Sequence, residues 1–164
     1  MPLTPYFCLM QITIRPAIQT DVPAMLGLVQ ELALYEKAPL EVTVTLEEMT
    51  AAGFGPGAIW KAFVSIVDGK LVGMSLYFTK YSTWKGKCMY IDDIIVTESM
   101  RGAGIGKLLF EETVAEAKRT HMRRLEWQVL EWNTPAINFY NKFSALLDPE
   151  WVNGKLTYEQ LQAI

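Results

Sequence analysis

Apolar residues recur along the chain with two different spacings, and the change of spacing marks the expected elements. One set lies at the i, i+3, i+4, i+7 positions of a single helix face: Met25, Leu28, Val29 and Leu32. Apolar runs of strand length occur instead at residues 11–17, 60–67, 70–78, 88–96 and 124–130. The chain is therefore predicted to combine strands with helices that pack on them.

Short local signals indicate where several of these elements begin or turn. Asp21 followed by Pro23 predicts a helix start, with Asp21 as a candidate cap. Thr45 and Glu48 have the capping-box spacing and predict a second, shorter helix, which the glycines around Phe54 should end. Asp68–Gly69 predicts a two-residue hairpin turn, because both central positions of such a turn need a positive φ.

The second half of the chain alternates strands and helices. A glycine-rich turn precedes a predicted helix over residues 104–120, and the cap signal of Asn133 with Pro135 precedes a short helix that ends near Phe143. Residues 79–85 are expected to form a polar loop, and residues 151–158 a last strand. The predicted order is β-α-α-β-β-β-α-β-α-β. The early hairpin is antiparallel and the later crossovers favour parallel pairs, so we expect a mixed α/β sheet and not a doubly wound Rossmann domain.

Length and composition fit one globular domain. The chain has 164 residues, of which 51% are hydrophobic and 20% are charged. We expect a single domain over residues 11–164. Residues 1–10 lack the positive n-region and the cleavage site of a signal peptide, so they are interpreted as a flexible extension, or as a misassigned start with Met10 as the true one.

Charge and reactive residues exclude several function classes. A net charge of −3 disfavours a general nucleic-acid binder, and no apolar run reaches the length of a membrane span. Cys8 and Cys88 do not suggest a disulfide framework, which favours a reducing compartment. The single histidine, His121, cannot build a histidine metal cluster, and we expect no metal.

The clearest functional pattern is the glycine turn between a predicted strand and a predicted helix, residues 101–106. Backbone N–H groups at a helix start can hold phosphate oxygens, and glycines let the backbone approach a ligand closely. A Walker A loop would need glycine at Arg101 and Ser or Thr at Leu108, and the Rossmann fingerprint would need glycine at Lys107. The alternative is a purely structural glycine turn.

A pair of acidic residues interrupts the apolar strand that precedes this turn. Asp92 and Asp93 should point to opposite sheet faces, because strand side chains alternate. A bulge or strand end that leaves both in water, or ordinary salt bridges, is the structural alternative, because a buried unpaired carboxylate is costly. In the functional interpretation, one carboxylate attracts a protonated amine and accepts its proton, and the second can hold a distant ammonium group.

Two motifs resemble those of the GNAT superfamily of acetyltransferases. Residues 101–106 resemble its (Arg/Gln)-x-x-Gly-x-(Gly/Ala) loop, and residues 133–140 resemble its Asn-x-x-Ala-x-x-(Phe/Tyr)-Tyr segment. The acidic pair and Glu131-Trp132-Asn133 look more specifically like the diamine acetyltransferases, and this resemblance extends from Ile12 to Tyr140. It implies the GNAT fold, acetyl-CoA as co-substrate, a cytosolic enzyme and a homodimer.

The resemblance also implies a role for particular residues. Tyr140 would protonate the CoA thiolate, and Asp92 would assist deprotonation of the amine. Acetyl-CoA would contact Ile94, Ile95, Val96, Arg101, Gly102, Ala103, Gly104, Ile105, Gly106, Asn133, Pro135 and Ala136. The amine site would comprise Tyr35, Glu36, Asp92, Asp93, Glu126, Trp127 and Gln128, together with Trp84, whose ring could stack on an alkyl ammonium.

Departures from the family pattern leave the amine open. Asp92 replaces a longer Glu, Ser82 stands at an acidic position, and Ser144 replaces a usual glycine. Direct acetyl transfer to a small diamine or polyamine is the leading interpretation. Thialysine, an amino acid, an antibiotic-like amine, a peptide or protein amine, and a non-catalytic acyl-CoA-binding module are the alternatives. A ping-pong route through Cys88 is disfavoured because no histidine lies nearby in the sequence to activate the thiol.

Overall fold

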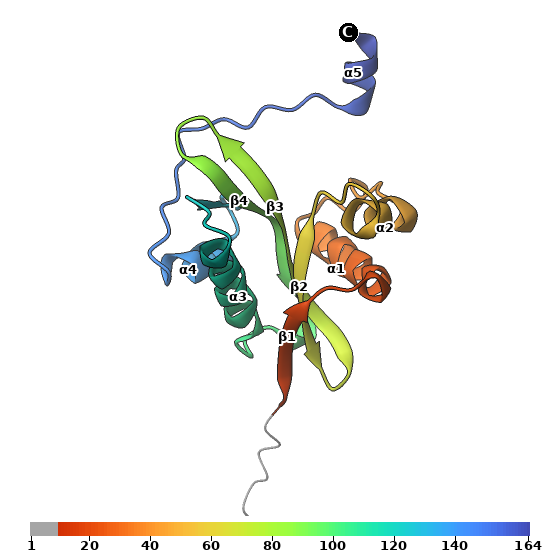
Figure 1. Cartoon of the computed structure of the whole chain (residues 1–164), viewed down its shortest axis with the longest axis vertical. Helices are drawn as coiled ribbons and strands as arrows, with labels where there is room; N and C mark the ends of the chain where they lie inside the picture. Colours follow the sequence, from red (N-terminus) through yellow and green to blue (C-terminus); the bar gives the residue numbers. More distant parts are fainter. Residues whose placement is uncertain (1–9) are drawn as a thin grey trace, which may run out of the picture. The chain divides into compact units, whose positions relative to one another are not determined.

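The computed structural model describes residues 10–164, and the expected extension therefore lies almost wholly outside the described residues. The chain divides into two compact units, one that ends at Trp127 and one formed by Gln128–Ile164. The first unit contains a five-stranded sheet with helices on both faces (Figure 1). Its strands are β1 (Ile12–Pro16), β2 (Lys61–Val67), β3 (Lys70–Ser82), β4 (Gly86–Val96) and β5 (Leu125–Glu126).

The sheet is mixed, as predicted. Strands β1 to β4 pair antiparallel in sequence order, and β5 pairs with β4 in parallel over two residues only. Asp68 and Gly69 have φ values of 49° and 75°, which confirms the two-residue turn between β2 and β3. The predicted polar loop at residues 79–85 was too long, because β3 continues to Ser82 and leaves a short turn before β4.

Helices α1 (Val22–Tyr35) and α2 (Leu46–Phe54) cover one face of the sheet, and α3 (Ile105–Arg119) covers the other (Figure 1). The predicted capping box of α2 is confirmed: Glu48 N–H donates to Thr45 Oγ1 and Thr45 N–H donates to the Glu48 carboxylate. Asp21 does not cap α1 with its side chain. Its carboxylate binds the Arg15 guanidinium and the Ile18 N–H instead, and so ties β1 to the turn before α1.

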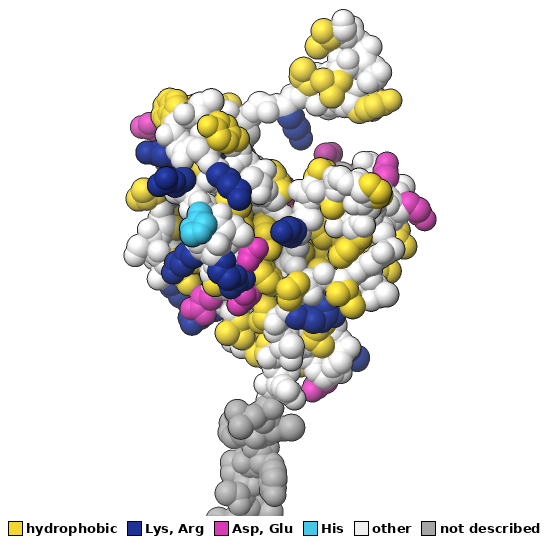
Figure 2. Space-filling model, viewed as in Figure 1, with side chains coloured by type: hydrophobic (Ala, Val, Ile, Leu, Met, Phe, Trp, Pro, Cys, Tyr) yellow, Lys and Arg dark blue, Asp and Glu magenta, His cyan; other side chains and the backbone are white. Residues whose placement is uncertain are grey.

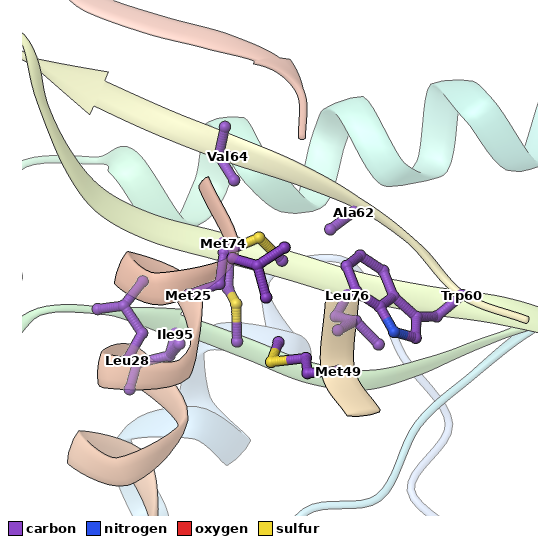
Figure 3. Close-up of a cluster of buried hydrophobic side chains, with 10 residues drawn as sticks. Met25, Leu28, Met49, Trp60, Ala62, Val64, Met74, Leu76 and Ile95 are labelled. Atoms are coloured by element: carbon purple, nitrogen blue, oxygen red, sulfur yellow. The ribbon is translucent and has the colours of Figure 1, made fainter. Parts of the chain in front are cut away.

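Apolar side chains from α1, α2 and the sheet form a hydrophobic core between these helices and the sheet face that they cover. Met25 and Leu28 of α1 and Met49 of α2 meet Val64, Met74 and Ile95 on the sheet (Figure 3). Each is at most 5% exposed. Burial of such side chains stabilises by roughly 1.5–3 kcal/mol each. The apolar stripe predicted for α1 is therefore a packing surface and carries no site.

The opposite sheet face packs against α3 through small residues. Gly73 of β3 lies so near its neighbours that a Cβ would come within 2.7 Å of Ser65 Oγ and 2.8 Å of the Ile95 carbonyl oxygen. Thr113 of α3 donates from Oγ1 to Leu109 O and lies 2.8 Å from Ser75 Oγ. Small residues on β2 and β3 thus let α3, which begins at the glycine turn, approach the sheet.

The second unit differs most from the prediction. It contains α4 (Thr134–Asn141) and α5 (Tyr158–Ala163). The predicted last strand at residues 151–158 was wrong: no strand of the described residues pairs with this segment, and Thr157 with Gln160 forms a capping box that starts a helix. The predicted strand 124–130 is reduced to the two residues of β5. Within residues 10–164, no helix is both long and apolar enough to cross a membrane.

Candidate active site

The glycine turn joins β4 to α3 and presents free backbone N–H groups. Gly102 and Gly104 have φ values of 80° and 82°, which side chains other than glycine rarely adopt, and a Cβ at either position would meet no atom within 4 Å. The N–H of Leu108 bonds to the Gly104 carbonyl, so the N–H groups of residues 105–107 precede the first helical hydrogen bond of α3. Open space and unpaired donors at a helix start fit the phosphates of a CoA group.

The segment of β4 that leads into this turn has one free edge. Ile94, Ile95 and Val96 pair with β3 on one side. On the other side β5 pairs only with Met89 and Tyr90, so within the sheet of the first unit β4 continues unpartnered beyond Tyr90. Backbone donors and acceptors on such an edge can bind an extended ligand in the manner of an added strand. This geometry fits the predicted contact with the pantetheine arm.

A β-bulge places the acidic pair. Leu76 lies opposite Asp93 while Tyr77 lies opposite Ile91, so Asp92 is the extra residue on β4. The bulge interrupts the alternation that the sequence predicts. It leaves the Asp92 side chain exposed by surface area and Asp93 half-buried. The structural alternative, a bulge that leaves both carboxylates in water, is therefore correct about the bulge. It is wrong about the water, because Asp93 is half-buried.

Three carboxylates of the first unit influence one another. Burial, together with the neighbouring charges of Asp92 and Glu36, raises the pKa of Asp93 to about 6. Desolvation also raises the pKa of Asp92 and of Glu36. No ion pair within the described residues neutralises Asp92 or Asp93. We call Glu36, Asp92 and Asp93 the acidic cluster, and its uncompensated charge suits a cationic ligand.

Two other predicted residues, Tyr35 and Arg101, lie together. The Arg101 guanidinium lies over the Tyr35 ring at 4.9 Å, and its Nε donates to the Val96 carbonyl oxygen at 3.0 Å. The same guanidinium approaches Glu31 on α1. Glu31 was not among the predicted site residues, because its partners lie more than 60 residues away along the chain.

Glu126 and Trp127 are occupied by contacts inside the first unit. Glu126 pairs with Arg124 at 3.1 Å and with Lys80 at 3.5 Å, so its charge is balanced by protein cations. The Trp127 ring packs edge-on against Phe110 of α3 at 5.5 Å. These contacts give both residues a structural role. Their role in the amine site stays a prediction.

Trp84 stands apart from the acidic cluster. It is 81% exposed in the turn between β3 and β4, and the six positions along β4 from Gly86 to Asp92 correspond to roughly 20 Å of extended chain. The surroundings of this turn are basic. Figure 2 shows Lys and Arg side chains around the histidine, and the contacts of Lys87 with the Thr120 carbonyl and of Arg124 with Ser82 bring residues 120–124 to the turn. The structure does not bring Trp84 together with the acidic cluster.

The remaining predicted residues belong to the second unit. Asn133 is the N-cap of α4 and accepts a hydrogen bond from the Ala136 N–H at 3.3 Å, with Pro135 in the first turn, as the sequence predicted. Tyr140 is 5% exposed, and burial raises the pKa of its phenol to about 12. The phenol therefore keeps its proton at neutral pH. Gln128 donates to Asn153 Oδ1 at 2.5 Å.

The hollow, the possible metal ligands and the free cysteine of the described residues add no chemistry to this site. A hollow of about 290 Å³ lies elsewhere in the first unit and contains none of the predicted residues; it is lined by Phe54, Trp60, Phe63, Tyr77, Glu116 and Arg119, among others. Among the described residues, no group of three His, Cys, Asp or Glu side chains could hold a metal ion. Cys88 is fully buried on β4.

Known proteins are similar to this chain in sequence. Residues 31–144 match the Acetyltransferase (GNAT) family. The chain is 34% identical over 142 residues to the thialysine N-epsilon-acetyltransferase of Bos taurus, across 82% of this chain and 84% of that protein. It is 31% identical over 140 residues to the human (Homo sapiens) spermidine/spermine N(1)-acetyltransferase-like protein 1, across 81% of this chain and 20% of that protein.

A solved structure has the same fold. The aminoglycoside N-acetyltransferase AAC(6')-Iy, in complex with CoA, superimposes with a TM-score of 0.72 at 17% identity, across 95% of this chain and 99% of that one. The expected GNAT fold is thereby confirmed. The family match spans more than half of the chain and includes the glycine turn, the β4 edge and α4. The chain therefore belongs to the GNAT acetyltransferase family and is an acetyl-CoA-dependent N-acetyltransferase.

Proposed function

We propose that this enzyme acetylates a small molecule that carries a primary amine and a second positive charge, such as a diamine, a polyamine or thialysine. The acidic cluster carries the proposal, since it sets three carboxylates beside the strand that leads into the glycine turn. The printed names of the relatives, thialysine and spermidine/spermine acetyltransferases, support the same substrate class. A neutral or acidic amine would gain nothing from this charge.

Asp92 is the proposed proton acceptor. An alkyl amine has a pKa of about 10.4 and reaches the site protonated, in which state it cannot attack a thioester. Asp92 is the more accessible carboxylate of the cluster and can take the proton directly or through water. Asp93 and Glu36 then hold the distant ammonium group, with Tyr35 beside them.

The acyl donor is proposed to lie along the free edge of β4 and across the glycine turn. Ile94, Ile95 and Val96 would bind the pantetheine arm, and a backbone N–H of this edge would polarise the thioester carbonyl. Residues 101–106 would hold the pyrophosphate, and Asn133, Pro135 and Ala136 would add contacts to CoA. The carbon–nitrogen bond forms as the carbon–sulfur bond breaks, and the Tyr140 phenol supplies the proton to the departing sulfur.

The remaining expectations are part of the same proposal. Trp84, Glu126, Trp127 and Gln128 would contribute to the amine site, the enzyme would be a cytoplasmic homodimer, and neither nucleic acid nor membrane would be a partner. Three of these residues have the weakest support as members of the amine site. Glu126 and Trp127 make structural contacts within the first unit, and Trp84 lies far along β4 from the acidic cluster.

A panel of amines tests the proposal. Release of the CoA thiol from acetyl-CoA is measured with spermidine, spermine, putrescine, thialysine, lysine and a short peptide. Saturable turnover with the small amines that carry two positive charges is the expected result. Saturable turnover with the peptide alone would replace the proposal by protein acetylation, and silence across the panel with intact CoA binding would refute the substrate class.

A further inference from the structure

Glu31 joins helix α1 to the segment that follows β4. Its carboxylate accepts a hydrogen bond from the Glu98 N–H at 2.7 Å and from Thr97 Oγ1 at 2.9 Å. The Arg101 Nη2 lies 3.7 Å from the Glu31 Oε1. One side chain thus binds three successive parts of the chain that leads into the glycine turn.

Arg101 is held from several directions by the same arrangement. Its Nε donates to the Val96 carbonyl oxygen at 3.0 Å, and its guanidinium lies 4.9 Å above the Tyr35 ring. Glu31 and Tyr35 are four residues apart on α1 and so share one helix face. The guanidinium therefore lies between this face of α1 and the end of β4, at the first residue of the glycine turn.

We propose that Glu31 is a positioning residue for the acyl donor: by fixing residues 97 and 98 and the Arg101 side chain, it holds the glycine turn in the conformation that receives the CoA pyrophosphate. The inference rests on the proposed donor site. A turn with two left-handed glycines, at either of which an added Cβ would meet no atom within 4 Å beyond the chain neighbours, has little packing of its own to fix it. Anchors outside the turn must supply the order, and Glu31 is one that reaches three of its flanking groups.

The charge of Glu31 can be separated from its hydrogen bonds. In Glu31→Gln an amide oxygen can still accept from Glu98 N–H or Thr97 Oγ1, whereas the attraction for Arg101 is lost. Thr97→Val removes one hydrogen bond and leaves the charge. Glu112→Gln is the matched control, because Glu112 is also a helix carboxylate paired with an arginine, Arg119 at 3.1 Å, at the end of α3 that lies away from the glycine turn.

Calorimetric binding of CoA tests the proposal without any amine, so its failure is distinguishable from failure of the proposed substrate. We expect Glu31→Gln to raise the CoA dissociation constant about 5- to 20-fold and Thr97→Val to raise it less. The thermal midpoint of each variant should stay near that of Glu112→Gln. Arg101→Gln alone and Arg101→Gln with Glu31→Gln should bind CoA equally weakly, because the contact that Glu31→Gln chiefly weakens is the one with Arg101.

A purely structural role would give a different pattern. Equal CoA affinity of Glu31→Gln and Glu112→Gln would overturn the proposal. Independent, multiplicative losses in the double variant would overturn the route through Arg101. Should Glu31→Gln unfold, Thr97→Val decides alone, and an unchanged CoA affinity in that variant counts against the proposal.

Discussion

Asp93 combines the two properties that a cation site needs, a carboxylate held away from water and other carboxylates beside it. Burial is the largest cause of its raised pKa, and the charges of Asp92 and Glu36 add to it. A cationic ligand would relieve both causes, because it brings an opposite charge into a poorly solvated place. Recognition of the ligand and titration of Asp93 should therefore be linked.

The pH dependence of amine affinity follows from this linkage. With the pKa of Asp93 at about 6, the cluster loses a negative charge as the pH falls through 6. Affinity for a diamine should decline below that pH and level off above it, and calorimetry between pH 5 and 8 measures it. The amine, with a pKa of about 10.4, stays protonated throughout this range and contributes no step.

Asp93→Asn supplies the control for that titration. This variant should bind the diamine several-fold more weakly at pH 8 and should show a flatter profile between pH 5 and 8. A wild-type affinity that does not change between pH 5 and 8 would show that the acidic cluster does not bind the amine.

Tyr140→Phe tests the proposed proton donor. The phenol, whose pKa burial raises to about 12, is protonated throughout the neutral range and has a proton to give. Loss of a general acid typically lowers turnover about 10²- to 10⁴-fold. We expect kcat to fall by about 10²-fold while CoA affinity changes little, and unchanged turnover would remove Tyr140 from the mechanism.

Among the elements, the contact between β3 and α3 depends on one small residue. Gly73→Ala would push a methyl group to within 2.8 Å of Ser65 Oγ and of the Ile95 carbonyl, and rigid backbone cannot move away cheaply. We expect a loss of about 1–3 kcal/mol in the free energy of unfolding. Gly27→Ala is the control: it lies within α1 with no atom near its Cβ position, and should stabilise by up to about 1 kcal/mol. Denaturant unfolding measures both, and equal stabilities would contradict the packing argument.

Local signals predicted most elements because they act within a few residues. The Asp68–Gly69 turn, the Thr45–Glu48 box and the Asn133 cap are each decided by neighbouring backbone. The bulge at Asp92 could be named only as an alternative, because it depends on the register between β3 and β4. The prediction of a strand at residues 151–158 was wrong for a related reason. Apolar residues suggested a strand, but a strand needs a partner, and the sheet of the described residues offers none there.

At the scale of the whole molecule, the fold brings together residues that lie far apart in the sequence. α1 ends at Tyr35 beside the acidic cluster, and β4 carries both aspartates and then the glycine turn. The motifs of the glycine turn and of α4 were visible in the sequence because their spacing is local. The link from Glu31 to Thr97, Glu98 and Arg101 was not, since only the packing of α1 beside β4 creates it.

The net charge of −3 hides an uneven distribution. Lysines and arginines gather around the turn between β3 and β4 and the end of α3, whereas the acidic cluster lies on β4 and after α1 (Figure 2). A cationic substrate is therefore favoured at the cluster by local field and not by overall charge. The enzyme should therefore select its substrates by their charge more than by their size.

The most direct test compares acetyl transfer to putrescine and to butylamine, which match in length and differ in the second ammonium group. The account predicts that kcat/KM for putrescine exceeds that for butylamine by at least about tenfold, and that Asp93→Asn narrows this ratio. Equal values for the two amines, or a ratio that Asp93→Asn leaves unchanged, would contradict the claim that the acidic cluster selects a dicationic amine.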